Sequence, residues 1–269
     1  MALVIGKPIV GRLETLQYAN KKFNWSDNII IGIGHKHAFY AWIRSKLTGK
    51  KCIYYCIDFY SPEIADNLWD SIFIWACMKM DKFLCNHCDI VWDISDRIQE
   101  GRWWYGHYKA KKVKIMPLSY PPDYFKFVEP FSKHPVYVGL SVYGKEIIPE
   151  KTFYINGKLP LRGMLEIISR HSMGISLWSR EGNNYYGDPG KTKLYSACGI
   201  PVIMTDNTPY AKIIKKTKAG IVIPYDEKAL LEAMKKIYAN YDYYKNNVKK
   251  TWKYIDAYEI FRNTELLVK

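Results

Sequence analysis

Short apolar runs alternate with helical patterns of apolar residues along the whole chain. Apolar runs bounded by turn residues predict buried strands, and apolar positions repeating every three or four residues predict helices. In the first half, strands are expected at residues 28–34, 51–57, 89–94 and 113–116. Helices are expected at 38–47, 64–85 and 96–100, the last with Ser95 as its N-cap. Such alternation is typical of parallel sheets with crossover helices, which predicts an α/β protein.

The same alternation continues in the second half. Strands are expected at 136–139, 152–155, 173–178, 202–204 and 220–223. Helices are expected at 161–171, 191–198, 209–216 and 227–238, followed by a helical tail from 240. Between the halves, a stretch rich in proline, aromatic residues and lysine has no regular pattern. We therefore expect a domain at 1–118, a linker at 119–135, a second domain at 136–250 and a final segment at 251–269.

The chain of 269 residues has a net charge of +14, from 40 Lys and Arg against 26 Asp and Glu. This excess favours anionic partners: phosphorylated small molecules, nucleic acid or an acidic membrane face. The alternative interpretation of this excess is a solvated lysine-rich surface without a specific partner. A basic nucleic-acid-binding protein is an alternative, although the sequence has no helix-turn-helix, zinc-finger or RNP motif.

The six cysteines lie mostly in apolar periodic stretches, which is typical of reduced core cysteines in a cytoplasmic protein. A zinc site can be drawn from four of them, Cys52, Cys56, Cys85 and Cys88. However, Cys52 and Cys56 lie on one face of a predicted strand, which favours the core interpretation. The N-terminus has no basic-then-apolar run, and no apolar stretch reaches spanning length. We expect a cytoplasmic protein, soluble or peripheral at a membrane.

Residues 185–205 carry the clearest chemistry. They predict a turn at 187–190, a helix from Lys191, a break at Gly199 and a buried strand. A helix that opens with Gly190 and Lys191 offers backbone N–H groups and a cation to a diphosphate, with Thr192 beside them. Asp188 is expected to order the turn. Tyr195 either packs beneath the site or contacts the ligand.

This run resembles the P-x-K…Y…A-C/A-G-x-P-V-I signature of GT-B glycosyltransferases of the family 4 type. Residues 88–95, 113–125 and 136–139, and Trp252 in the tail, resemble further family motifs in the family's order. The resemblance covers about residues 28–260. It implies two Rossmann-like domains with parallel sheets facing a central cleft, and a C-terminal helix that packs back toward the first domain. Only a short stretch precedes residue 28, so the N-terminal domain is expected to be abbreviated.

The resemblance also implies an activity. It predicts a hexosyltransferase that moves a sugar from a UDP- or GDP-sugar to a hydroxyl of a glycan, lipid-linked or protein acceptor, with retention. No metal and no cofactor besides the nucleotide-sugar co-substrate are implied. Lys191 would neutralise the leaving diphosphate. The expected donor-binding residues are Gly139, Lys145, Glu181, Pro189, Gly190, Lys191, Thr192 and Tyr195.

One departure from the family concerns its paired glutamates. Tyr186 and Leu194 stand where these glutamates would be, and Glu181 is a candidate replacement for the first. A non-catalytic sugar- or nucleotide-binding subunit therefore stays open as an alternative.

The first domain carries the acceptor-side candidates. Asp58 follows a predicted strand, where an acid or base would meet the acceptor. His35 and His37 follow a glycine-bearing strand, on a predicted loop facing the cleft. They would contact the donor sugar or acceptor, or merely cap the helix. Their i, i+2 spacing would also allow a metal, although the enzymes that this chain resembles need none.

The first domain also predicts reversible binding to anionic membranes. Its tryptophans suit the membrane interface and its basic residues suit anionic lipid. The alternative is that Trp103 and Trp104 pack in the core while the lysines are solvated. The residues concerned are Trp69, Trp75, Trp103, Trp104, Arg102, Lys109, Lys111, Lys112 and Lys114.

Overall fold

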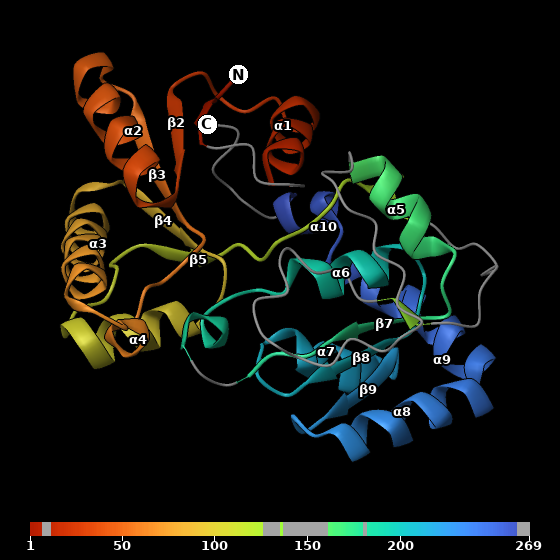
Figure 1. The fold of residues 1–269 in the computed structure, drawn as a ribbon. Coiled ribbons are helices and arrows are strands. Elements are labelled where there is room, and N and C mark those ends of the chain that lie inside the picture. The colour runs from red at the N-terminus through yellow and green to blue at the C-terminus, as the bar shows by residue number, and fades with distance from the viewer. Residues whose placement is uncertain (7–11, 126–134, 137–160, 180–181, 263–269) are drawn as a thin grey trace.

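The computed structural model describes residues 1–6, 12–125, 135–136, 161–179 and 182–262. Two parallel sheets with flanking helices form the molecule (Figure 1). One sheet has the strand order β1-β2-β3-β4-β5 and the other β6-β7-β8-β9. All the strand pairs are parallel, so the predicted α/β class is confirmed.

The first sheet contains the strands β1 (Leu3–Ile5), β2 (Ile29–Ile33), β3 (Lys51–Cys56), β4 (Ile90–Asp93) and β5 (Val113–Ile115). Its helices are α1 (Arg12–Lys22), α2 (Gly34–Thr48), α3 (Leu68–His87) and α4 (Arg97–Gly106), with the 3₁₀ turns η1 (Pro62–Ile64) and η2 (Pro122–Tyr124). The strands follow chain order, whereas a doubly wound sheet reverses its order at a switch point. Within the described residues, a sheet in simple chain order, without a switch point, agrees with an abbreviated domain.

The unit formed by β1 and α1 was not predicted. β1 has only three residues, and α1 has a weak apolar periodicity because charged and amide side chains interrupt it. The sequence pattern first becomes regular at β2, whose five residues are all buried. The prediction therefore began one βα unit too late.

The second sheet contains β6 (Pro135–Val136), β7 (Met173–Ser176), β8 (Val202–Thr205) and β9 (Gly220–Ile223). The elements around it are α5 (Leu161–Ser169), η3 (Gly182–Tyr185), α6 (Gly190–Ala197), α7 (Tyr210–Thr217), α8 (Glu227–Ala239), α9 (Tyr241–Val248), η4 (Lys249–Tyr254) and α10 (Ala257–Phe261). The expected strand at 152–155 lies outside the described residues.

The C-terminal helix α10 lies against the first sheet's elements. The Phe261 ring is 5.5 Å from that of Trp25 and 6.0 Å from that of Trp92, and Tyr258 stacks on Phe23. Just before α10, Asp256 forms an isolated parallel bridge with Tyr120. The chain thus passes between the two sheets twice, and the two passages are hydrogen-bonded side by side.

Two details differ from the sequence predictions or qualify them. Ser95 is not the N-cap of α4: the helix begins at Arg97, and the Ser95 hydroxyl instead donates to the Tyr186 carbonyl at 2.6 Å. Its hydroxyl is therefore used between the sheets and not within the helix. Among the described residues, no helix has both the length and the hydropathy needed to cross a bilayer.

Candidate active site

The N-terminus of α6 lies at the carboxyl edge of the second sheet. Pro189 occupies the position before the helix, and Gly190 and Lys191 form its first turn. The Lys191 ammonium group lies 5.6 Å from the ring centre of Trp178, which follows β7. Burial lowers the pKa of Lys191. Backbone N–H groups and a partly desolvated amine at one helix end suit an anionic ligand, because a bound anion favours the charged amine.

Two predicted donor-binding side chains point into the protein. Thr192 is fully buried, and its hydroxyl donates to Ser176 Oγ at 2.7 Å. Tyr195 is also fully buried, with its ring against Gly174, where a Cβ would lie 2.2 Å from the ring. The packing interpretation of Tyr195 is therefore the one that the structure supports. The Thr192 hydroxyl is held by Ser176 beneath the helix, which leaves the backbone N–H of Thr192 as its group for a phosphate.

A buried ion pair, which sequence reasoning missed, holds the start of α6 to the segment that crosses between the sheets. Lys193 Nζ lies 2.5 Å from Asp188 Oδ2, and the two side chains are at most 5% exposed. The Leu118 backbone N–H donates to Asp188 at 2.6 Å, and Lys193 donates to the Leu118 carbonyl at 2.7 Å. Tyr120 also donates to the Gly190 carbonyl. Asp188 thus connects the turn before α6 to Leu118 of the first domain and to Lys193.

The segment before α6 is held by the first sheet's α4. Arg97 donates to the carbonyls of Tyr185 and Asn207, and its guanidinium lies 4.1 Å from the Tyr185 ring centre. Tyr185 in turn donates to Glu100 at 3.2 Å. Together with the Ser95 contact, these bonds attach Tyr185 and Tyr186, just before α6, to the first sheet's elements.

His35 and His37 lie in the first turn of α2, so the predicted loop is wrong. The cause is Gly34, whose φ of 72° turns the chain directly from β2 into the helix. Gly32 assists, because a Cβ there would lie 2.3 Å from the Ala38 Cα. Successive helical residues are rotated by about 100°, so these two side chains point to different sides. They cannot share a metal in the way their spacing allowed.

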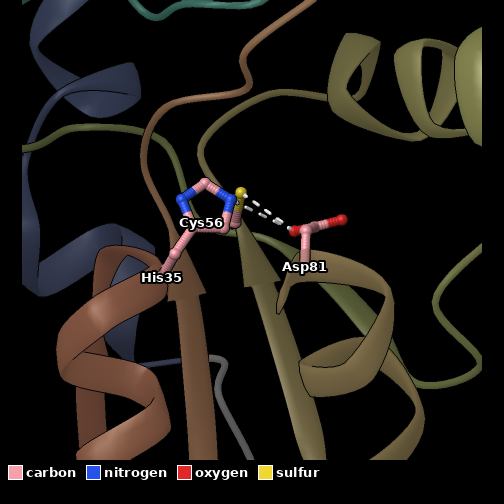
Figure 2. Close-up of side chains that lie close together, drawn as sticks. All are labelled: His35, Cys56 and Asp81. Atoms are coloured by element: carbon pink, nitrogen blue, oxygen red, sulfur yellow. Dashed lines mark hydrogen bonds and ion pairs between the residues drawn. The ribbon is translucent and has the colours of Figure 1, made fainter. Parts of the chain in front are cut away.

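His35 is the better placed of the two histidines. Its side chain is 11% exposed, and Nε2 lies 3.8 Å from Asp81 Oδ1 (Figure 2). Its ring lies near those of Tyr54 and Tyr60. Burial lowers the pKa of His35, although Asp81 and Asp58 oppose this. The lowered pKa favours the neutral ring, which can donate one hydrogen bond and accept another.

Asp81 belongs to a buried charge network. Arg102 donates to its two oxygens at 2.7 and 3.0 Å, and to Asp93 at 2.7 Å. Burial alone would raise the pKa of Asp81, but Arg102 holds it well below its usual value. Burial raises the pKa of Asp93 despite Arg102. Arg102 is fully buried and therefore wrong as a membrane-binding cation.

His35, Cys56 and Asp81 place their ligand atoms within 4.8 Å of one another, which makes them a candidate metal group among the described residues (Figure 2). The oxygens of Asp81, however, already accept bonds from Arg102, Tyr54 and Tyr108. A metal cation would also be repelled by the adjacent guanidinium. We therefore assign this group to the buried network and not to a metal.

The zinc interpretation of the cysteines is wrong. Cys52 and Cys88 lie with their sulfurs 3.4 Å apart, whereas Cys56 and Cys85 lie against Asp81 at 3.8 and 3.7 Å. The four thiols thus form two pairs with different partners. All six cysteines are free.

The remaining predicted residues divide into two groups. Asp58 is exposed just past β3, and its charge opposes the lowering of the His35 pKa. These two residues therefore lie at one edge of the first sheet. Gly139, Lys145 and Glu181 lie outside the described residues, so their roles stay predictions.

The sequence and the fold were compared with known proteins. Residues 121–263 match the glucosyltransferase 3-like C-terminal domain family. No curated protein matches the chain in sequence. Among solved structures, Anabaena Alr3699/HepE in complex with UDP and glucose is similar with a TM-score of 0.66 at 12% identity, covering 96% of this chain and 81% of that one.

Two further structures have the same fold. Sucrose-phosphate synthase from Thermosynechococcus elongatus gives a TM-score of 0.65 at 12% identity, with 91% of this chain and 73% of that chain covered. WaaG, a glycosyltransferase involved in lipopolysaccharide biosynthesis, gives 0.56 at 11% identity, with 97% of each chain covered. At these identities the similarity shows a shared fold, that of the GT-B glycosyltransferases.

Proposed function

The chain belongs to the glucosyltransferase 3-like family of GT-B glycosyltransferases, and on that premise we propose that it transfers a hexose from a nucleoside-diphosphate sugar to an acceptor hydroxyl. One observation carries the proposal. Lys191 and the first turn of α6 lie at the carboxyl edge of the second sheet, in a segment that Ser95 and Leu118 of the first domain hold by hydrogen bonds. α/β proteins bind ligands at such edges.

Lys191 and the α6 N-terminus would stabilise the leaving diphosphate. As the bond to the sugar breaks, negative charge grows on the β-phosphate, and fixed donors there lower the barrier. A bound diphosphate favours the ammonium form of Lys191, whose pKa burial has lowered. Reaction with retention and without a metal belongs to this proposal.

His35 and Asp58 would act on the acceptor. Asp58 is exposed and would accept the proton of the attacking hydroxyl, while the neutral His35 hydrogen-bonds the sugar. The UDP bound to Anabaena HepE supports a UDP-sugar as the first donor to test, with a GDP-sugar next. The six free cysteines fit the proposed cytoplasmic location.

The test of this proposal combines nucleotide binding and turnover. UDP or GDP should raise the melting temperature, and Lys191→Ala should remove most of that shift and lower turnover by about 10²–10³-fold. Lys212→Ala, at an exposed lysine on α7, is the matched control and should behave as wild type. Nucleotide stabilisation of Lys191→Ala equal to that of wild type would place the phosphate site elsewhere. Turnover should survive EDTA, and activity lost with EDTA but restored by manganese would refute the metal-independent mechanism.

A non-catalytic sugar- or nucleotide-binding subunit is the second candidate. Tyr186 and Leu194, at the positions of the family's paired glutamates, are 4% and 5% exposed, so neither side chain is available to a donor. A hydrolysis and transfer panel with UDP-, GDP-, ADP- and dTDP-sugars separates the two candidates. Nucleotide-induced stabilisation without turnover of any donor would favour the binding subunit.

A further inference from the structure

Helix α3 presents large apolar side chains to solvent. Leu68, Trp69, Phe73 and Trp75 are 72%, 79%, 55% and 61% exposed. Together with Ile72, which is 47% exposed, spacings of three, four and seven residues place these side chains on one face of the helix, whereas Ile74 is buried on the other side. Single exposed apolar residues are ordinary, but a continuous stripe marks an interaction surface.

Helix α4, next to α3, also presents exposed aromatic side chains. Trp103 and Trp104 are 51% and 52% exposed, so the interpretation that they pack in the core is wrong. The two helices are neighbours, because Arg102 of α4 binds Asp81 of α3. Figure 1 shows α3 on the outer side of the first sheet, whereas α4 also borders the second half, where the Trp104 ring lies 6.3 Å from that of Tyr185.

Lysines accompany the exposed rings. Lys79 lies 5.7 Å from the Trp75 ring centre, and Lys109 lies 5.4 Å from that of Trp103. Lys82 packs on Tyr108 at 5.6 Å, and two more exposed lysines, Lys111 and Lys112, follow in the loop after α4. The nearby carboxylates lie around the start of α3 and belong to Glu63, Asp66 and Asp70. Asp70 accepts a hydrogen bond from Asn67, and Glu63 accepts one from Tyr105.

We propose that this aromatic–lysine surface, formed by Leu68, Trp69, Ile72, Phe73, Trp75, Lys79, Lys82, Trp103, Trp104, Lys109, Lys111 and Lys112, docks on an anionic lipid bilayer. Tryptophan rings suit the interfacial region of a bilayer, and lysine ammonium groups suit anionic headgroups next to it. Charge complementarity decides the occupant: a second copy of this chain would bring a further net charge of +14. The docking surface includes no residue of the α6 site, so the proposal does not rest on sugar transfer.

Co-sedimentation with phosphatidylcholine vesicles, with and without phosphatidylglycerol, tests the proposal. Wild-type protein should bind the anionic vesicles, bind the neutral ones at least tenfold more weakly, and dissociate as salt is raised. Trp69→Ser with Phe73→Ser should weaken binding to anionic vesicles at least tenfold. Tyr225→Ser with Leu231→Ser, at exposed apolar positions of the second domain, is the matched control and should bind as wild type.

Lys79→Glu with Lys109→Glu tests the charges without removing an apolar group and should also weaken anionic binding. Unchanged melting temperatures and UDP-induced shifts show that these variants remain folded. Anionic binding that is unchanged in both α3–α4 double variants would overturn the proposal. Self-association that Trp69→Ser with Phe73→Ser abolishes, without any vesicle binding, would overturn it as well and identify a second copy as the occupant.

Discussion

The two halves of the molecule each bury an ion cluster, but they use it differently. In the first half, Asp81, Arg102 and Asp93 join α3, α4 and β4 of one domain. In the second half, Asp188 and Lys193 hold the backbone of Leu118, at the end of the first domain. The first cluster stabilises a single domain, whereas the second fixes the candidate donor site to its neighbour.

This difference separates stability from ligand binding. Removing the cation of the first cluster should destabilise a domain without altering the donor site directly. Removing the cation of the second should loosen the start of α6 while the core of each sheet stays packed.

Arg102→Met should have the largest effect. It leaves Asp81 and Asp93 buried without their cation, so the free energy of unfolding should fall by about 3–5 kcal/mol. Urea unfolding followed by tryptophan fluorescence measures this. Arg44→Met, at an exposed position of α2, is the control and should change stability by about 0.5 kcal/mol or less. A loss below about 1 kcal/mol for Arg102→Met would contradict the network's structural role.

Lys193→Met should have a smaller effect on stability and a visible one on nucleotide binding. Asp188 keeps its bond from the Leu118 N–H, so a loss of about 2 kcal/mol is expected. The UDP-induced rise in melting temperature should also shrink, because the α6 N-terminus loses its attachment through Lys193. Lys212→Met provides the comparison for a lysine on the surface. A full UDP shift in Lys193→Met would separate the ion pair from the donor site.

The smallest expected effect is that of His35 on the pH dependence of stability. The pKa of His35 is lower in the folded protein than its ordinary value of 6.5, so the unfolded chain binds more protons as the pH falls past 6.5. Stability should therefore decrease from pH 7 to pH 5. His35→Gln should give a shallower slope of melting temperature against pH, and His37→Gln the wild-type slope. Equal slopes in all three proteins would show that His35 does not contribute.

Much of the fold followed from the sequence because most strands are short apolar runs with clear limits. The helix at Gly190 was also predicted, since Pro-Gly-Lys is a local signal. The start of α2 was missed because it depends on one positive φ at Gly34, which a sequence pattern does not show.

The buried charges were harder to predict. Asp81 precedes the buried Cys85 by four residues, and Arg102 follows the buried Ile98 by four, so helical spacing places each on a buried face. That signal was available in the sequence. The partners of Lys193 and Arg97 were not predictable, because Leu118 and Asn207 lie 75 and 110 residues away.

The paired passages at Tyr120 and Asp256 have a mechanical consequence. Two hydrogen bonds join them, from Tyr120 N to Ile255 O at 2.8 Å and from Ala257 N to Tyr120 O at 2.9 Å. A single connecting strand permits torsion about its own axis, whereas two strands bonded side by side resist torsion and still allow bending. We therefore expect any relative motion of the two halves to be bending about a line through these residues and not twisting.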